Sequence, residues 1–272
     1  MTGTTTRASR PSLRRLRTAG AAILALGVTY SAPAIAHAAT PLTVVTIQFD
    51  DGNGDTYQWI STLNTHGFHA TWYINSGSIG TTDHLTWTQV VALSTAGNEI
   101  GSHTINHVDI KKLKLAAARF QVCQDRVNLA NQGFMPESFA YPFGSFDATA
   151  ESVVKYCGDN SGRGVSGVND KTVFGESIPP ADAYATRTPA DPKQGTTVAT
   201  IEGYVTAAEQ NGGGWVQLTF HHICNNCDAY SITEANMQAL LDWLQGQVST
   251  GSVAVETTQQ VIGGPYITPF CC

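Results

Sequence analysis

Two spacings of apolar residues alternate along the chain. Residues 44–49 form an apolar, β-branched run that ends in the turn Asp51-Gly52-Asn53-Gly54, which is typical of a buried strand followed by a loop. Similar short runs predict strands at residues 70–74, 99–102, 138–140, 215–220 and 253–256. Helical spacing predicts helices at residues 57–65, 86–95, 115–132, 147–155 and 232–247.

This order of elements predicts the fold class α/β. Repeated alternation of strand and helix favours a mostly parallel sheet, either open or closed into a barrel. The sequence shows no internal repeat and no clean linker. Residues 161–197 have the least regular pattern and contain four prolines, so we expect loops over one face there rather than a domain boundary. We therefore predict a single domain over residues 39–272.

The first 38 residues differ in kind from the rest. Hydrophobic residues make up 42% of the 272-residue chain and charged residues 13%, which suffices for a sizeable core. Before residue 39, five arginines and no acid accompany an apolar run at residues 19–28 and the small-residue triplet Ala36-His37-Ala38. We expect residues 1–38 to be a cleaved secretory signal peptide and the protein to be secreted. An uncleaved membrane anchor is disfavoured, because a spanning helix needs about 20 apolar residues.

Beyond residue 38 the chain is acidic, with 10 Lys and Arg against 21 Asp and Glu, a net charge of −11. Such a chain has no general attraction for nucleic acid or for an anionic membrane. We therefore expect neither nucleic acid nor, once the signal peptide is cleaved, a membrane among its partners. The sequence leaves the oligomeric state open.

Six cysteines follow the signal region, and export favours disulfides. The segment 224–227, Cys-Asn-Asn-Cys, could be a small disulfide loop, a redox motif or half of a zinc site. We favour the disulfide because no second pair has zinc spacing. Cys123 and Cys157 would then form a second bridge. Cys271 and Cys272 end the chain side by side, where free thiols and intermolecular pairing both stay open.

Reactive side chains follow four of the predicted strands. They are Asp50-Asp51, His103 with His107, the segment 141–144 (Tyr-Pro-Phe-Gly), and His221-His222. In α/β folds the site lies where strands end at their carboxyl edge. We therefore expect two carboxylates and up to four imidazoles at one rim.

Side-chain alternation decides which of the last two histidines faces this rim. The apolar face of the strand at 215–220 consists of Val216, Leu218 and Phe220. Because this face should pack on helices, His221 falls on the opposite, polar face and His222 points away. The same alternation places Asp50 on the polar face of the first strand.

His103 and His107 stand four residues apart, so they would project from one side if their segment turned helically, as a metal-ligand pair requires. An Asp as third ligand would leave positions open for water. Asp50 and Asp51 could divide ligation and proton acceptance between them. Taken singly, the histidines could equally be surface or capping residues, and the Asp pair could belong to a simple turn.

Together these segments resemble the ordered motifs of the polysaccharide deacetylases, which are carbohydrate esterase family four or the NodB homology domain. The matching segments are Gln48-Phe49-Asp50-Asp51-Gly52, His103-Thr104-Ile105-Asn106-His107, Ala140-Tyr141-Pro142-Phe143-Gly144 and Leu218-Thr219-Phe220-His221. The resemblance runs from about residue 44 to about residue 261. The Phe-Asp-Asp-Gly and His-Thr-x-x-His motifs in this order and spacing are its most specific part.

The resemblance implies a distorted (β/α) barrel and hydrolytic removal of acetyl groups from sugars. The implied ligands of a divalent metal, usually zinc or cobalt, are Asp51, His103 and His107. The metal would polarise the acetyl carbonyl and activate a water, with Asp50 as general base. The backbone N–H of Phe143 would help to stabilise the oxyanion, and His221 would protonate the leaving amine.

The sequence departs from the family pattern in two places, and both concern residues that would adjust the reactivity of Asp50 and His221. Many members carry an Arg at the position of Ala140, where it orients the base. Arg163 could supply this charge from a loop, although a solvated Arg at that position is an equal alternative. The acid–Trp motif that usually lies between the Pro motif and the last His is not evident in residues 161–170.

We therefore predict a secreted, metal-dependent hydrolase that removes N-acetyl groups from N-acetylglucosamine-containing polysaccharides such as chitin, peptidoglycan or an exopolysaccharide. Its expected partner is the acetylated glycan. One alternative is an O-deacetylase of acetylxylan, because the tetrahedral step is shared. Another is a carbohydrate-binding domain with a dead site. A zinc peptidase is disfavoured because His-Glu-x-x-His is absent.

Overall fold

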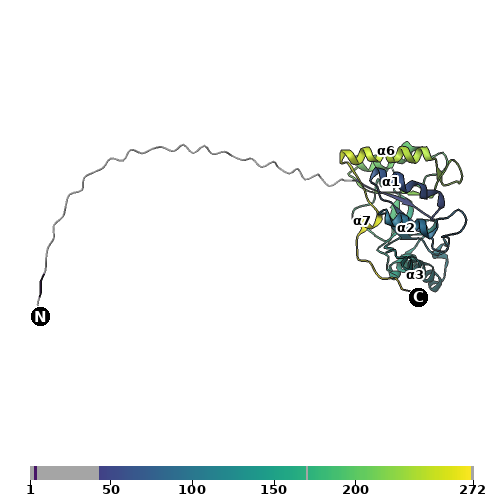
Figure 1. Ribbon diagram of the computed structural model, residues 1–272, viewed down its shortest axis with the longest axis horizontal. Coiled ribbons are helices and arrows are strands. Elements are labelled where there is room, and N and C mark those ends of the chain that lie inside the picture. The colour runs from purple at the N-terminus through teal and green to yellow at the C-terminus, as the bar shows by residue number, and fades with distance from the viewer. Residues whose placement is uncertain (1–2, 5–42, 170, 271–272) are drawn as a thin grey trace. The chain divides into compact units, whose positions relative to one another are not determined.

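A curled sheet of parallel strands, covered by helices, forms the centre of the protein (Figure 1). The structure, a computed structural model, describes residues 3–4, 43–169 and 171–270. The predicted signal peptide and the Cys271-Cys272 pair therefore lie outside the described residues. From Thr43 on, the described residues belong to one compact unit. Among the described residues, no helix combines the length and the apolar character needed to cross a membrane.

Strand β1 (Thr43–Phe49) is buried along its whole length and pairs with three other strands. It pairs with β7 (Gly214–Phe220) along its whole length, and on its other edge first with β10 (Val253–Val255) and then with β2 (Thr71–Ile74). The sheet continues from β2 through β3 (Glu99–Ser102), β4 (Ser138–Ala140), β5 (Ser161–Gly167) and β6 (Thr186–Thr188). Every pairing is parallel, so the strand ends gather at one rim.

Helices connect most of the strands, as the alternation predicts. They are α1 (Ile60–His66), α2 (Trp87–Thr95), α3 (Leu115–Asn131), α4 (Ala148–Cys157), α5 (Val198–Gln210), α6 (Glu234–Thr250) and α7 (Thr258–Ile262), with 3-10 turns η1 (Gly54–Trp59), η2 (Ile110–Lys112) and η3 (Pro142–Gly144). Several helices begin at a side-chain cap: Thr86 before α2, Asp147 before α4 and Thr233 before α6 each accept a backbone N–H. In Figure 1, α6, α1, α2 and α3 succeed one another down the molecule.

The two faces of the sheet differ as the alternation predicts. The apolar face of β7, Val216, Leu218 and Phe220, is buried in a core that includes residues of α5 and α6. The opposite face is polar and equally buried. There Gln48 donates to Gln217 at 2.9 Å, and the Thr219 hydroxyl donates back to Gln48 at 3.2 Å. The interior of the curled sheet is therefore a hydrogen-bonded polar network rather than an apolar core.

The expectation of loops throughout residues 161–197 is wrong, because this segment supplies strands β5 and β6. Helix α5, which follows it, was also not predicted. β5 lacks an apolar pattern because its glycines fit under aromatic rings. A Cβ at Gly162 would lie 2.5 Å from the Tyr141 hydroxyl oxygen, and one at Gly164 would lie 2.6 Å from the Phe146 ring.

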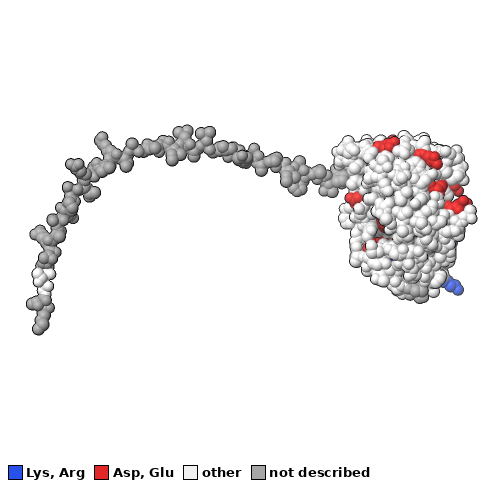
Figure 2. Space-filling view, in the orientation of Figure 1, with Lys and Arg blue, Asp and Glu red and all other residues white. Residues whose placement is uncertain are grey.

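Two disulfides form among the described cysteines, in the predicted pairs. Cys123–Cys157 joins α3 to α4, and Cys224–Cys227 closes the turn between the short strands β8 (His222–Ile223) and β9 (Ser231–Ile232). Most of the molecular face in Figure 2 is uncharged, with scattered acidic groups. This surface agrees with the low content of charged residues.

We expect Gly162→Ala to lower the free energy of unfolding by about 1–3 kcal/mol, because the added methyl group displaces the buried Tyr141 ring. Urea unfolding measures the loss. The matched control is Gly203→Ala in α5, where a Cβ meets nothing within 4 Å. Helix propensity makes that change stabilising by about 0.5–1 kcal/mol. Equal effects of the two substitutions would contradict the packing argument.

Candidate active site

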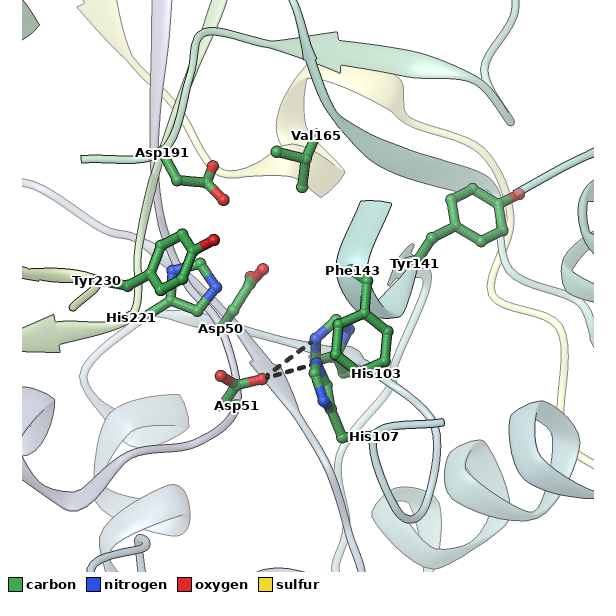
Figure 3. Close-up of a pocket in the computed structure, with 10 residues that line it drawn as sticks. All are labelled: Asp50, Asp51, His103, His107, Tyr141, Phe143, Val165, Asp191, His221 and Tyr230. Atoms are coloured by element: carbon green, nitrogen blue, oxygen red, sulfur yellow. Dashed lines mark ion pairs between the residues drawn. The ribbon is translucent and has the colours of Figure 1, made fainter. Parts of the chain in front are cut away.

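A cavity of about 290 Å³ opens at the rim where the strands end (Figure 3). Its lining residues are Asp50, Asp51, His103, His107, Tyr141, Phe143, Val165, Asp191, His221 and Tyr230. Six of the seven predicted site residues are among them. The seventh, Arg163, is buried and contacts Asp50. The structure thus brings together residues that are spread over more than 170 positions of the chain.

Asp51, His103 and His107 form a compact group on one side of the cavity. The Oδ1 atom of Asp51 lies 3.4 Å from Nε2 of His103 and 3.3 Å from Nε2 of His107. One ligand atom from each residue lies within 4.8 Å of the others. These are one carboxylate and two imidazoles, the donor set that first-row divalent metals accept.

Three observations test whether this group fits a cation. The Oδ1 atom of Asp51 is buried and makes no hydrogen bond among the described residues. Nδ1 of His103 lies 2.7 Å from the Ala140 carbonyl oxygen, which can only accept, so Nδ1 carries a proton and Nε2 is the nitrogen left for a metal. Burial raises the pKa of Asp51, but the interaction with His103 and the charges of His107 and His221 outweigh it and hold that pKa below its ordinary value. The residues fit a divalent metal.

The two histidines converge through a loop, so the helical turn considered for this segment does not occur. Residues 103–107 have no helical assignment, and Thr104 and His107 adopt left-handed backbone conformations at φ 66° and 50°. Asp51 is also left-handed, at φ 70°. Such conformations are uncommon outside glycine and cluster at functional sites. The ring centroids of His103 and His107 end 5.0 Å apart.

Asp125 and Asn75, which the sequence analysis missed, hold this loop from behind. The Asp125 carboxylate on α3 accepts the backbone N–H of His103 at 3.0 Å and that of Ser76 at 2.9 Å. The Asn75 amide donates to the carbonyl oxygens of His103 and Thr104. Both side chains are buried, so the position of the His103 backbone depends on hydrogen bonds shielded from water.

Asp50 lies deeper than Asp51 and is paired with a cation. Its backbone N–H donates to the Phe220 carbonyl oxygen at 2.9 Å, which fixes it at the end of β1. Nη2 of Arg163 donates to both Asp50 carboxylate oxygens, at 2.5 and 2.7 Å. Arg163 is the register partner of Ala140 across the β4–β5 pair. The Arg163 guanidinium therefore reaches Asp50 from β5. This strand lies beside Ala140, the position at which the resemblance described above would place an Arg.

His221 occupies the opposite side of the cavity, as the face alternation predicts. The Asn53 amide donates to its carbonyl oxygen at 3.1 Å, and the Tyr230 ring lies 5.3 Å from its ring. Nδ1 of His221 and Oδ1 of Asp191 are both buried and make no hydrogen bond within the described part of the chain. Figure 3 shows the Asp191 carboxylate directed into the cavity above His221 and Asp50.

Asp191 is thus an acid near His221 that the sequence analysis missed. It follows β6, some twenty residues beyond residues 161–170, where the acid–Trp motif was expected, and it has no neighbouring Trp. The Ala-Asp-Pro sequence around Asp191 indicates a turn but gives no sign of a site.

Phe143, at φ 61°, is exposed at the mouth of the cavity with its ring 4.5 Å from that of His107.

Comparison with known proteins finds one matching family and one curated relative at this level of similarity. Residues 37–160 match the family described as "Polysaccharide deacetylase". "Putative polysaccharide deacetylase YxkH" of Bacillus subtilis (strain 168) is 30% identical over 105 residues. That alignment covers 38% of this chain, and the chain spans only 38% of the length of that curated relative.

Solved structures share the fold at low sequence identity. A family 4 carbohydrate esterase from Streptomyces lividans, in complex with acetate, is 19% identical with a TM-score of 0.54, covering 84% of this chain and 98% of that one. The Bc1960 peptidoglycan N-acetylglucosamine deacetylase is 14% identical with a TM-score of 0.56, covering 83% and 90%. A family 4 acetyl xylan esterase from Clostridium thermocellum, in complex with a cobalt ion, is 16% identical with a TM-score of 0.54, covering 80% and 90%.

The curled parallel sheet and these likenesses define a (β/α) barrel of the carbohydrate esterase type, which confirms the predicted fold class. The likeness to the polysaccharide deacetylases is carried by residues 37–160, which are less than half of the chain.

Asp191 gives a pH dependence that can be measured. Burial raises its pKa to about 6, although the charges of His221 and Arg163 lower it. Because the folded state holds this proton more tightly than the unfolded chain, ionisation destabilises the fold, and this stability is lost as pH rises from about 4 through 6. Asp191→Asn should therefore gain stability relative to the parent between pH 4 and pH 7. Urea unfolding of both proteins in chelator measures this gain, and parallel pH curves would contradict it.

Proposed function

We propose that this chain is a secreted, metal-dependent hydrolase that removes N-acetyl groups from N-acetylglucosamine-containing polysaccharides. The observation that carries the proposal is the cavity in which a carboxylate–imidazole trio, a paired aspartate and a separate histidine face one another. The match of residues 37–160 to the polysaccharide deacetylase family supports deacetylation as the reaction class. Secretion rests on the signal-like pattern of residues 1–38.

Asp51, His103 and His107 would hold the divalent ion, zinc or cobalt. Such an ion supplies a Lewis acid for the acetyl carbonyl and a lower pKa for the attacking water. Asp51 contributes negative charge, and the two imidazoles contribute neutral nitrogen ligands. The Ala140 carbonyl and Asp125 keep His103 in position for this task.

Asp50 accepts the proton of the attacking water. The Arg163 guanidinium donates to both of its oxygens, which fixes the orientation of the carboxylate. The backbone N–H of Phe143 stabilises the oxyanion that develops on the acetyl oxygen. His221 then donates a proton to the leaving nitrogen, with Asp191 on the same side of the cavity.

Two aromatic rings support a sugar substrate. Phe143 and Tyr230 line the cavity, with 68% and 41% of their surfaces exposed. An exposed ring offers a flat apolar face to a pyranose, whereas Trp59 and Trp72 belong to the core. The acetylated glycan is therefore the proposed partner.

O-deacetylation of xylan is the second candidate. The fold likeness to the acetyl xylan esterase from Clostridium thermocellum favours it. Acetate release from chitooligosaccharides and from acetylxylan, each with and without chelator, separates the two. Release from neither substrate class, together with retained glycan binding, would instead support a dead binding domain and end the hydrolase proposal.

The separation of proton acceptance from metal binding can be tested by paired variants at Asp50 and His103. We expect Asp50→Asn to keep its metal and to lose about 10²–10⁴-fold in turnover, because the proton acceptor is lost while Asp51, His103 and His107 stay in place. His103→Ala should lose both metal and turnover. Elemental analysis and acetate release on the same preparations measure both properties. Full turnover in Asp50→Asn would refute its role as base.

The role of His221 depends on the leaving group. An amine must be protonated to leave, whereas an activated phenolate leaves without help. His221→Gln should therefore lose far more activity on an N-acetyl substrate than on an activated acetyl ester. Initial rates on the two substrates measure the ratio. If both rates fall equally, His221 is not the acid.

A further inference from the structure

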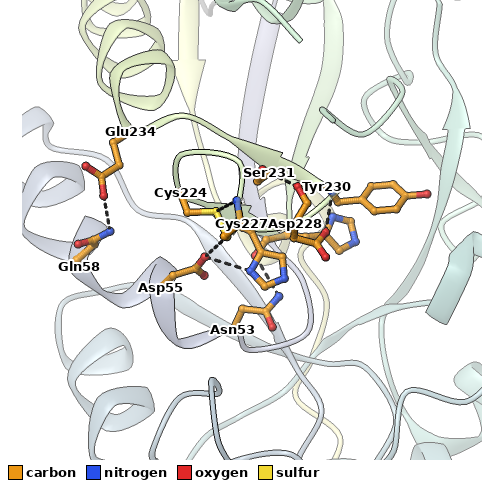
Figure 4. Close-up of a disulfide and its surroundings, with 11 residues drawn as sticks. Asn53, Asp55, Gln58, Cys224, Cys227, Asp228, Tyr230, Ser231 and Glu234 are labelled. Atoms are coloured by element: carbon orange, nitrogen blue, oxygen red, sulfur yellow. Dashed lines mark hydrogen bonds and ion pairs between the residues drawn. A yellow bond between two sulfur atoms is a disulfide. The ribbon is translucent and has the colours of Figure 1, made fainter. Parts of the chain in front are cut away.

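A second cluster of metal-binding side chains lies outside the active-site cavity, beside the Cys224–Cys227 disulfide (Figure 4). It borders a surface depression of about 600 Å³, which none of the active-site groups lines. Asp55 contributes to it from η1 and His222 from β8. Nothing in the proposed reaction uses these residues.

The cluster is built around the carboxylate of Asp55. Its Oδ2 atom lies 3.0 Å from Nδ1 of His222 and 3.8 Å from Sγ of Cys227. One ligand atom each from Asp55, His222 and Cys227 lies within 4.8 Å of the others. The second carboxylate oxygen of Asp55, Oδ1, is buried and has no hydrogen-bond partner among the described residues. A cation would give that oxygen a partner.

The cysteine turn adds a fourth donor with the spacing of a zinc ligand pair. Two residues separate Cys224 from Cys227, and their Cα atoms lie 5.8 Å apart. The backbone N–H of Cys227 donates to Sγ of Cys224 at 3.2 Å. A backbone donor aimed at sulfur favours a thiolate once the disulfide is open. Asn226 makes this tight turn in the left-handed conformation, at φ 64°.

We propose that Cys224, Cys227, His222 and Asp55 form a zinc site when the Cys224–Cys227 disulfide is reduced. A thiol reductant supplies two electrons and two protons: two molecules of the thiol become one disulfide, and the protein gains two Cys thiols. Zinc then displaces both protons and takes two thiolates, one imidazole nitrogen and one carboxylate oxygen. Oxidation reverses the exchange and releases the ion.

Solvent access separates this disulfide from the other one. Cys227 is exposed, whereas Cys123 and Cys157 are 1% and 0% exposed. Thiol–disulfide exchange needs access to a sulfur atom, so a mild reductant opens Cys224–Cys227 first. The Cys123–Cys157 bridge, which joins α3 to α4, stays closed.

The site would join the two segments that carry Asp50 and His221. η1 follows the Asp50-Asp51 turn directly, and β8 begins one residue after His221. The Asn53 side chain, which precedes η1, already donates to the His221 carbonyl oxygen. A zinc ion on Asp55 and His222 would therefore tie these segments more firmly than the present ion pair does.

Metal stoichiometry tests the proposal on the full chain. The protein is treated with a water-soluble phosphine, freed of it without oxygen, saturated with zinc and desalted. We expect the reduced chain to retain one more zinc ion than the oxidised chain. Cys227→Ser and His222→Gln should lose the additional ion, whereas His103→Ala should keep it. Equal zinc content in the reduced and oxidised chains would overturn the proposal.

Cobalt provides an independent readout, because the active-site ligands contain no sulfur. Cobalt bound by Cys224 and Cys227 gives a thiolate-to-metal charge-transfer absorption in the near ultraviolet, which the Asp51, His103 and His107 group cannot produce. The band should appear only after reduction and vanish in Asp55→Asn combined with Cys227→Ser.

The matched control is His84→Gln. His84 borders the same depression but is not in the ligand cluster. This variant should retain both the band and the additional zinc ion. A band that is absent from the reduced wild type, or that His84→Gln also abolishes, would contradict the assigned ligands. Neither result depends on whether the chain deacetylates glycans.

Discussion

Asp50 and Arg163 form an ion pair closed off from water, and the geometry of the cavity depends on it. Their side chains are 3% and 1% exposed. Either charge alone at that depth would cost several kcal/mol, so the chain must bring both to one place. Asp50 follows β1 and Arg163 belongs to β5, and strands β2, β3 and β4 lie between these two strands in the sheet. The sheet has to curl for them to meet, and the cavity lies inside that curl.

The polar face of the sheet is subject to the same requirement, because its buried polar side chains must also find partners. Gln48, Gln217 and Thr219 exchange hydrogen bonds across the β1–β7 pair directly beneath the cavity. Such a network tolerates little displacement, because each donor that shifts leaves a buried partner unsatisfied. The buried polar side chains that precede Asp50 and His221 are therefore held in place by these hydrogen bonds.

Features that depend on a local pattern of residues could be predicted from the sequence. Strand ends, the polar face of β7 and the inward direction of His221 all follow from alternation over a few residues. The sequence analysis placed Arg163 in a loop because the glycines of β5 remove the apolar pattern of a strand. Its contact with Asp50 depends on the pairing of β4 with β5, which no local pattern encodes. Asp191 was missed for the same reason: a three-residue strand carries it to the rim. The convergence of His103 and His107 required left-handed residues, which spacing alone does not reveal.

Four non-glycine residues at the metal side of the cavity, Asp51, Thr104, His107 and Phe143, have left-handed backbones. Conformations of this kind cost of order 1–3 kcal/mol each, which the buried sheet must offset. Selection for thermal robustness alone would replace residues such as Thr104 by glycine or asparagine. The chain keeps these conformations at some cost in thermal stability. In return, the donor atoms at the cavity are already oriented for a ligand, so binding would require little further ordering of the site.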